Sequence, residues 1–256
     1  MEFKHAVVTG AASGMGAVEV RNLRARGVAV TALDLSPELK GAYAGDPGVV
    51  CEVGDVTDLA WCRSVLAAAE TRQPVDLLFH AAGIMPGGDV ADMGAERINR
   101  LMEINYGGTV NAVDAVLPAM LARGSGQIVL FGSTAGIVPS RKFAAYGASK
   151  AAINYYAEVL AHEAAPQGVS VLLVTPGAIR TPLLQQASDG PKAITAMSPR
   201  LAKILIGDPE RTVAAIERAM RRRKKLVRPN GTAVAALRRT SPRLTWALTE
   251  AMEKRS

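Results

Sequence analysis

Short apolar runs alternate with longer stretches of helical periodicity through the first two thirds of the chain. The apolar runs predict strands at residues 6–9, 28–33, 49–52, 77–80, 127–131 and 169–175. Several of these runs are continuously apolar, which is expected when helices cover both faces of a sheet. The stretches between them predict helices, for example at residues 15–26, 58–70, 105–123 and 146–165. This order predicts an α/β fold with a doubly wound parallel sheet in three layers, α/β/α.

The last third of the chain is less regular, but no repeat, low-complexity segment or linker divides it from the rest. We therefore expect residues 1–256 to form a single domain. Residues 182–208 mix apolar side chains with glycine and proline, which predicts a partly helical lid over a substrate. Residues 211–220 predict a helix, and residues 226–256 form a basic C-terminal extension with two short amphipathic helices around Ser241-Pro242.

The net charge of +7 is concentrated at the end of the chain. Residues 215–256 hold twelve Lys and Arg against three Asp and Glu, a charge of +9, which leaves −2 for residues 1–214. A basic surface spread over the whole fold is therefore not indicated, and we expect no nucleic-acid partner.

Cysteine usage and hydropathy limit the kinds of site and the cellular location that the sequence allows. Cys51 and Cys62 lie eleven positions apart without a CxxC spacing or a histidine pair, so we expect neither a disulfide framework nor a metal site. The first five residues run directly into a predicted strand, and we expect no secretory signal. No window has the roughly 18 apolar residues of a spanning helix. These features predict a cytoplasmic protein whose membrane contact, if it has any, is peripheral.

A glycine-rich turn, Thr9-Gly10-Ala11-Ala12-Ser13-Gly14-Met15-Gly16, follows the first predicted strand. Glycines at these spacings let the backbone approach a pyrophosphate, whose charge is stabilised at the N-terminus of the next helix. Asp34 ends the second strand, 18 residues beyond Gly16, where a carboxylate accepts hydrogen bonds from an adenine ribose and repels a 2′-phosphate. The turn contains no Arg or Lys. The pattern therefore favours NAD over NADP. The alternatives are that the glycine-rich segment is only a turn between two elements, and that Asp34 is only a helix N-cap or turn residue.

Candidate catalytic residues follow the fifth predicted strand. Ser133 comes first, and Tyr146 and Lys150 are four residues apart, one turn of the predicted helix. A phenol with its ordinary pKa of ~10 is a poor base, but an ammonium within ~4–6 Å favours the phenolate. Ser133 is suited to hold a substrate oxygen while Tyr146 exchanges a proton with it. The alternative is that Tyr146, as is common at helix starts, serves only packing.

Together the motif Thr-Gly-x-x-x-Gly-x-Gly, a Ser thirteen residues before Tyr-x-x-x-Lys and a later Pro-Gly resemble the short-chain dehydrogenase/reductase family over residues 6–181. The resemblance implies a Rossmann-like fold and transfer of a hydride between NAD and an alcohol or ketone. It implies that Asn105 holds a water linking Lys150 to solvent, and that Lys150 binds the nicotinamide ribose. The implied catalytic set is Asn105, Ser133, Tyr146 and Lys150.

The motif and the resemblance also give a set of cofactor contacts. One segment departs from the family: its Asn-Asn/Ala-Ala-Gly sequence appears here as His80-Ala81-Ala82-Gly83. Because an imidazole both donates and accepts hydrogen bonds, we expect a changed detail and not a lost site. The expected contacts are Gly10, Ser13, Gly14, Met15, Gly16, Asp34, Leu35, Asp55, Val56, His80, Ala81, Ala82, Gly83, Tyr146, Lys150, Pro176, Gly177, Ile179 and Thr181.

The apolar lid predicts a hydrophobic secondary alcohol or ketone of steroid, retinoid, terpenoid or fatty-acyl type. Two alternatives are an NADPH-dependent 3-ketoacyl reductase, which Asp34 disfavours, and a non-catalytic dinucleotide-binding regulator, which would not need Ser133, Tyr146 and Lys150. The resemblance implies a homodimer or homotetramer joined through the helices at residues 105–123 and 146–165. Three interpretations of the basic extension stay open: subunit or core packing, contact with an anionic membrane, and attraction of an anionic substrate such as an acyl-CoA.

Overall fold

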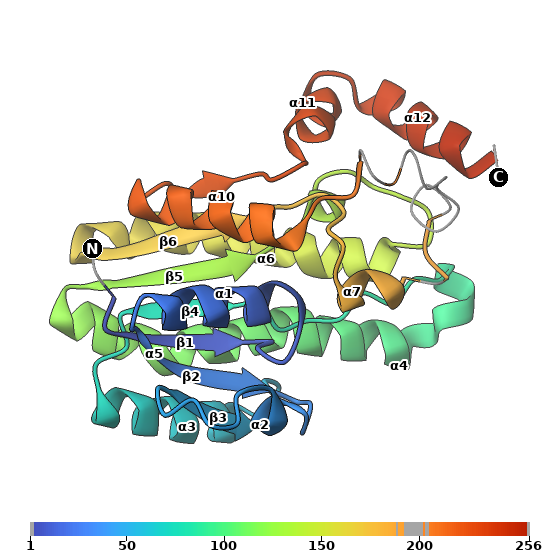
Figure 1. Ribbon diagram of the computed structural model, residues 1–256. Coiled ribbons are helices and arrows are strands. Elements are labelled where there is room, and N and C mark those ends of the chain that lie inside the picture. Colours follow the sequence, from blue (N-terminus) through green and yellow to red (C-terminus); the bar gives the residue numbers. More distant parts are fainter. Residues whose placement is uncertain (1–2, 188, 192–201, 203–204, 255–256) are drawn as a thin grey trace.

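A computed structural model describes residues 3–187, 189–191, 202 and 205–254 (Figure 1). Its centre is a seven-stranded sheet in the order β3-β2-β1-β4-β5-β6-β7, and every neighbouring pair of strands is parallel. This confirms the predicted doubly wound parallel sheet. The strands are β1 (His5–Thr9), β2 (Ala29–Asp34), β3 (Val49–Val53), β4 (Leu77–His80), β5 (Gly126–Phe131), β6 (Val169–Val174) and β7 (Leu226–Val227).

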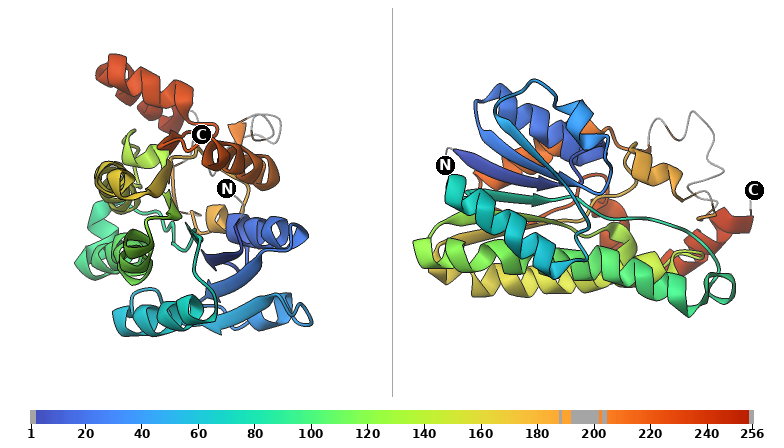
Figure 2. Two further views of the ribbon diagram at one scale, coloured as in Figure 1. Left: turned by 90° about the vertical axis from the view of Figure 1, so that its left-hand side faces the viewer. Right: turned by 90° about the horizontal axis from the view of Figure 1, so that it is seen from below.

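Helices cover both faces of this sheet, as the continuously apolar strands predict (Figure 2). One face is covered by α1 (Gly14–Ala25), α2 (Leu39–Ala42) and α10 (Pro209–Arg221). The other is covered by α3 (Leu59–Arg72), α5 (Gly108–Arg123) and α6 (Ala144–Glu163). The strand order reverses between β1 and β4. In open α/β sheets a ligand crevice is expected outside the carboxyl ends of the strands at such a reversal.

Alternation along each strand builds the two cores. In β4, Leu78 packs into the layer under α3, α5 and α6, whereas Leu77 and Phe79 pack into the layer under α1 and α10. All three side chains are fully buried. The Phe79 ring meets that of Phe131 edge-on, with 5.1 Å between the centroids. By the same alternation His80 faces the layer that α5 and α6 cover.

The helical segment before α5 differs from its prediction. Helix α4 (Val90–Met102) leads into the π-helical turn η1 (Glu103–Gly107), and α5 starts only at Gly108. The prediction of one regular helix over residues 105–123 is therefore wrong at its beginning. A π turn contains one extra residue, which the 3.6-residue periodicity does not reveal. Its effect is to place the fully buried Asn105 at the junction.

The remaining segments are short connections and the C-terminal helices. The connections include η2 (Thr134–Gly136), η3 (Ala165–Gln167) and α7 (Pro182–Gln185). Most of the predicted lid beyond α7 lies outside the described residues. The extension contains the two predicted helices, α11 (Thr232–Thr240) and α12 (Pro242–Lys254), which pack on each other and stand out from the three layers (Figure 1). In the described part of the chain, no helix is long and apolar enough to cross a membrane.

Candidate active site

The turn between β1 and α1 approaches neighbouring backbone more closely than a side chain would allow. Gly10 has φ +65°, and a Cβ there would lie 2.9 Å from the carbonyl carbon of Ala81. A Cβ on Gly16 would overlap the carbonyl oxygen of Gly10. The side chain of Ser13 makes no capping hydrogen bond to α1, so the first amides of the helix are left to a ligand. The turn therefore has the form of a cradle for an anionic group.

Asp34, at the end of β2, is held next to this turn. Its Oδ2 accepts a hydrogen bond from the amide of Ala12 at 2.9 Å, and its Oδ1 accepts one from the amide of Ser36 at 2.9 Å. The second bond closes a local turn of the Asx type, so Asp34 also has the turn role that the sequence analysis gave as an alternative. Both bonds fix the carboxylate beside the glycine-rich turn, in the cleft described next.

A cleft of about 390 Å³ lies at the carboxyl ends of β1, β2, β3 and β4. Most of the expected cofactor contacts line it: Gly10, Ser13, Gly14, Met15, Gly16, Asp34, Leu35, Asp55, Val56, Ala81, Ala82, Gly83 and Thr181. Residues that the sequence analysis did not single out also line it: Ser36, Gly54, Ile84, Arg100, Ile104, Pro182, Leu183 and Gln186. Arg100 and Ile104 come from α4 and η1, segments without a motif of their own.

A second, smaller pocket of about 200 Å³ adjoins the cleft and shares Met15, Thr181 and Leu183 with it. It holds Ser133 and Tyr146 and the expected contacts Pro176, Gly177 and Ile179. None of its described lining residues carries a charge. Its apolar part includes Leu184 and Pro191, which belong to the predicted lid. The sequence analysis did not single out the other apolar lining residues: Met85, Ala135, Val138, Phe143 and Ala178.

The structure brings the Ser, the Tyr and the Lys together. Tyr146 is 5% exposed, and the Nζ of Lys150 lies 5.8 Å from the centroid of its ring. Lys150 is also 5% exposed, and its Nζ donates to the carbonyl oxygen of Phe131 at 2.9 Å. Ser133 caps η2 by accepting a hydrogen bond from the amide of Ala135 at 3.0 Å. The three side chains thus come from the end of β5 and from one face of α6.

Burial is the main cause of the pKa shifts of Tyr146 and Lys150. It raises the pKa of Tyr146 to about 12, while a hydrogen bond with the side chain of Ser133 acts in the opposite direction. It lowers the pKa of Lys150 to about 8. The lowering of the Tyr146 pKa that the sequence analysis expects from Lys150 is therefore not met by the protein alone. The side chain of Phe143, whose ring centroid is 5.2 Å from that of Tyr146, contributes to this apolar enclosure.

Asn105 connects the site to the loop after β4. Its Oδ1 accepts a hydrogen bond from the amide of Ile84 at 2.8 Å, and its Nδ2 donates to the carbonyl oxygen of Ile84 at 3.0 Å. The same Nδ2 donates to the Oγ of Ser149 at 3.0 Å, and that hydroxyl donates to the carbonyl oxygen of Tyr146 at 2.8 Å. A Cβ on Gly83 would lie 3.0 Å from Oδ1 of Asn105 and 3.7 Å from Nζ of Lys150. Asn105 therefore lies beside the catalytic candidates.

His80 does not reach either cavity. It is 1% exposed, and its Nδ1 is 2.9 Å from the Oγ1 of Thr9, which also accepts a hydrogen bond from the amide of Ala82 at 3.1 Å. Burial lowers its pKa to about 3, and the charge of Lys150 acts in the same direction, so the ring is neutral. The structure thus places His80 beneath the cleft, where it supports the loop that carries Ala82.

The segment after β6 is fixed on both sides. The amide of Thr134 donates to the carbonyl oxygen of Pro176 at 3.0 Å, and the amide of Gly177 donates to that of Pro229 at 2.9 Å. Further on, Ile179 forms a parallel bridge with Gly207. Pro229, just after β7, therefore holds the Pro176-Gly177 segment that lines the pocket beside Tyr146.

The cavities suit a dinucleotide and give no sign of a metal site. The fixed carboxylate of Asp34, the glycine cradle and the uncharged pocket beside Tyr146 fit an adenine ribose, a pyrophosphate and a nicotinamide ring, which follow one another in that order along a dinucleotide. Among the described residues, no three His, Cys, Asp or Glu side chains gather in a way that could hold a metal ion.

Comparison with known proteins places this geometry in context. Residues 4–192 match the sequence profile of the family described as short chain dehydrogenase. The chain is 33% identical over 218 residues to the oxidoreductase UcpA of Salmonella typhimurium, with 80% of this chain and 83% of that protein covered. It is 35% identical over 225 residues to the glycine betaine reductase ATRR of Emericella nidulans, which covers 85% of this chain and only 18% of that longer protein.

Two solved structures of short-chain dehydrogenases superpose on this chain. A short-chain dehydrogenase from Streptomyces avermitilis superposes with a TM-score of 0.81 at 30% identity, over 97% of this chain and 96% of that one. A short-chain dehydrogenase from Sphingobium yanoikuyae in complex with NADPH superposes with a TM-score of 0.77 at 26% identity, over 88% and 87% of the two chains.

Proposed function

The chain belongs to the short-chain dehydrogenase family and is an oxidoreductase of the alcohol type; on this premise we propose that it interconverts an uncharged, apolar secondary alcohol and its ketone with NAD. The observation that carries the proposal is that Ser133 and Tyr146, with Lys150 next to Tyr146, line the small pocket that adjoins the glycine-lined cleft. The nucleotide would be held by the glycine-rich turn, by Asp34 and by the loop that contains Asp55 and Val56.

Asp34 supports NAD as the cofactor. Its carboxylate is fixed by the amides of Ala12 and Ser36, so it cannot easily turn away from a 2′-phosphate. The Sphingobium yanoikuyae structure contains NADPH, which makes NADP the competing possibility. Comparing the two cofactors is therefore part of the test below.

The chain's own residues supply binding and proton transfer. A bound nicotinamide dinucleotide supplies the hydride acceptor or donor and, when oxidised, a positive charge. Tyr146 exchanges the proton with the substrate oxygen, and Ser133 holds that oxygen by a hydrogen bond. With a pKa of about 8, Lys150 is mostly protonated at neutral pH, and its charge favours the phenolate of Tyr146 once the site is loaded.

Ketone reduction is the direction for which Tyr146 is prepared. Because its pKa is raised to about 12, the phenol is protonated at neutral pH and ready to donate to a carbonyl oxygen. Alcohol oxidation first requires loss of that proton. We propose that Asn105, next to Lys150 and Gly83, holds the water through which the proton leaves.

The pocket beside Tyr146 supports an uncharged substrate. Its apolar lining from Met85, Val138, Phe143 and Leu184 offers no partner for a carboxylate or a phosphate. A 3-ketoacyl thioester is itself uncharged at its reacting end, so that alternative is disfavoured by Asp34 and not by this pocket.

We further propose that the chain forms a homodimer or homotetramer through the outer surface of α5 and α6. Tyr155 is 75% exposed and Val159 is 39% exposed, one turn apart on α6. Such a stripe on a helix is typical of a face that another subunit covers.

The test is turnover of a panel of uncharged secondary alcohols and ketones with NAD and with NADP, followed by the absorbance of the reduced nicotinamide. We expect activity with NAD, and a loss of about 100-fold or more in Tyr146→Phe, because a positioned proton donor contributes at least that much. Tyr155→Phe, an exposed tyrosine on the same helix, is the matched control and should turn over like the parent. Equal rates for Tyr146→Phe and the parent would refute the mechanism. Binding of the dinucleotide without turnover of any substrate would favour the regulator.

A further inference from the structure

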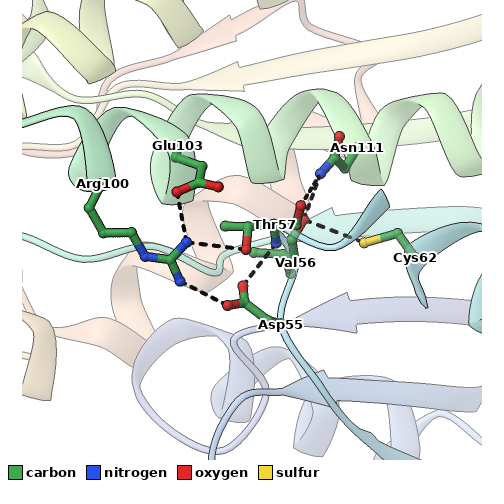
Figure 3. Close-up of polar contacts among 7 residues, drawn as sticks. All are labelled: Asp55, Val56, Thr57, Cys62, Arg100, Glu103 and Asn111. Carbon is green, nitrogen blue, oxygen red and sulfur yellow. Dashed lines mark hydrogen bonds and ion pairs between the residues drawn. The ribbon is translucent and has the colours of Figure 1, made fainter. Parts of the chain in front are cut away.

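A polar cluster lies at the end of the cleft formed by the loop after β3 (Figure 3). Arg100 reaches from α4 to this loop, where its Nη2 donates to the Oδ2 of Asp55 at 2.9 Å. Its Nη1 donates to the Oε2 of Glu103 at 2.8 Å and lies 3.4 Å from the Oγ1 of Thr57. The guanidinium is thus fixed in one plane by three partners.

The backbone of the loop is anchored independently of Arg100. The Nδ2 of Asn111, on α5, donates to the carbonyl oxygens of Val56 at 3.0 Å and of Thr57 at 3.1 Å. From α3, the thiol of Cys62 donates to the carbonyl oxygen of Val56 at 3.5 Å. These contacts hold the main chain, so the specific contribution of Arg100 is the orientation of the Asp55 side chain (Figure 3).

Asp55 has unused hydrogen-bonding capacity toward the cleft. Its Oδ1 accepts from the amide of Thr57 at 2.9 Å, and its Oδ2 accepts from Arg100. A carboxylate has about four acceptor positions, so acceptor capacity remains on both oxygens. Burial raises the pKa of Asp55, but the hydrogen bonds from Thr57 and Arg100 outweigh it and hold the pKa below its usual range. At neutral pH this side chain is therefore only an acceptor.

Stability does not explain the cluster. The side chains of Arg100 and Asp55 are 46% and 33% exposed, and ion pairs this accessible to solvent contribute little to stability. The hydrogen bonds from Thr57 and Arg100 instead fix the orientation of the Asp55 carboxylate. The apolar Leu35 and Val56 line the cleft beside Asp55, so a flat ring placed there would present its edge to a held carboxylate.

We propose that Arg100 is a positioning residue that sets base specificity: it fixes the Asp55 carboxylate to accept a hydrogen bond from the exocyclic amino group of adenine. This inference rests on the proposed function, because the cleft must hold a dinucleotide. The chemical consequence is specific. A base that carries a carbonyl oxygen in place of the amino group offers an acceptor to an acceptor, and it is rejected only while the carboxylate is held in place.

The experiment compares NAD with nicotinamide hypoxanthine dinucleotide, which differs from NAD in that amino group. Dissociation constants for these two dinucleotides and for NADP are measured by titration calorimetry for the parent, Arg100→Gln and Arg100→Lys. We expect the parent to prefer NAD by about tenfold or more, in line with one hydrogen bond to a charged group. In Arg100→Gln this preference should fall to about twofold. Arg100→Lys keeps the charge but cannot bridge Asp55 and Glu103 at once, so it should restore the preference only in part.

Arg63→Gln is the matched control. Arg63 on α3 forms a similarly exposed ion pair with Asp114 on α5, at 2.8 Å, but does not line the cleft. It should leave both dissociation constants unchanged. A general structural weakening would raise both constants equally and leave their ratio intact.

Three results would overturn the inference. An unchanged preference in Arg100→Gln would show that Asp55 needs no such support. A loss confined to NADP would show that Arg100 binds a 2′-phosphate instead. Failure of the parent to bind either dinucleotide would contradict the proposed function and this inference together. The first result leaves the proposed function unchanged, and the second would change only its cofactor.

Discussion

Single residues determine the chemistry through their burial. The ionisable side chains of Tyr146, Lys150 and His80 are all buried, and burial shifts each pKa toward the value that favours the neutral form. The sequence indicates which residues meet, because the spacing of Tyr146 and Lys150 on a helix is fixed. It does not indicate the protonation state, since desolvation depends on neighbours such as Phe143 that belong to no motif.

The first prediction concerns cofactor choice at Asp34. In Asp34→Ser the repulsion of a 2′-phosphate disappears, while a hydroxyl can still accept from the amide of Ala12. The ratio of kcat/KM for NAD to that for NADP should therefore fall by about tenfold or more, and steady-state kinetics with both cofactors measure it. Exposed Glu38→Gln, a few residues further on, serves as the control. An unchanged ratio would mean that Asp34 serves only the local turn.

At the scale of secondary-structure elements, the glycine-rich turn between β1 and α1 leaves no room for side chains at Gly10 and Gly16. The second prediction is that Gly16→Ala weakens NAD binding by more than tenfold, because its Cβ would overlap the carbonyl oxygen of Gly10 and the turn must move. Gly41→Ala, in α2, is the matched control, since a Cβ there meets nothing within 4 Å. Calorimetric titration with NAD compares the two variants. Equal binding in both would contradict the proposed cradle.

The packing of α1 against α10 leads to the third prediction. Glu19 on α1 is fully buried; burial and the nearby Glu217 raise its pKa to about 8, against the opposing effect of Arg26. The folded state therefore retains a proton that the unfolded chain releases near pH 4.5. The associated stability is complete below that pH and is lost as the pH rises to about 8, by at most about 5 kcal/mol.

Urea unfolding at several pH values tests this linkage. Glu19→Gln should be about as stable as the parent at pH ~5 and more stable at pH ~8, because it has no proton to lose. Glu96→Gln, an exposed change on α4, should follow the parent at every pH. If the parent and Glu19→Gln gave parallel stability profiles, the buried carboxyl would not be the cause.

At the level of elements the sequence predicts strands better than irregular helices. The continuous apolar runs mark six of the strands of the sheet to within about two residues. The π turn at Glu103–Gly107 was missed because one extra residue disrupts the helical periodicity on which such predictions depend. Helix α4 precedes that turn, and its backbone is non-helical at Gly94. Arg100 was missed because it stands in no motif, although it lies only five residues before Asn105.

At the scale of the whole molecule, alternation of strands and helices is sufficient to predict the sheet, since parallel strands need crossover helices. It is not sufficient to predict the role of the C-terminal extension. Helices α11 and α12 contact mainly each other, and Leu244, Trp246 and Leu248 are 49%, 39% and 47% exposed. A surface of this kind is compatible with each of the three interpretations, so those interpretations stay predictions.

The fourth prediction separates two ways of assembling subunits. Light scattering after size-exclusion chromatography should show a dimer or tetramer for the parent and a smaller species for Tyr155→Asp, because a carboxylate would be buried against a partner. Leu244→Asp, an exposed apolar position on α12, should keep the parent's mass. The reverse outcome would assign the assembly to the extension and not to α6.

The account as a whole depends on a dinucleotide lying along the cleft with its reactive ring beside Tyr146. A crystal structure of the protein with NAD is the most direct test. We expect the adenine at Asp55 and Val56, the pyrophosphate at the glycine-rich turn, and the nicotinamide ring among Ser133, Tyr146 and Lys150. A nicotinamide ring far from these three side chains, with the protein otherwise intact, would contradict the proposed chemistry.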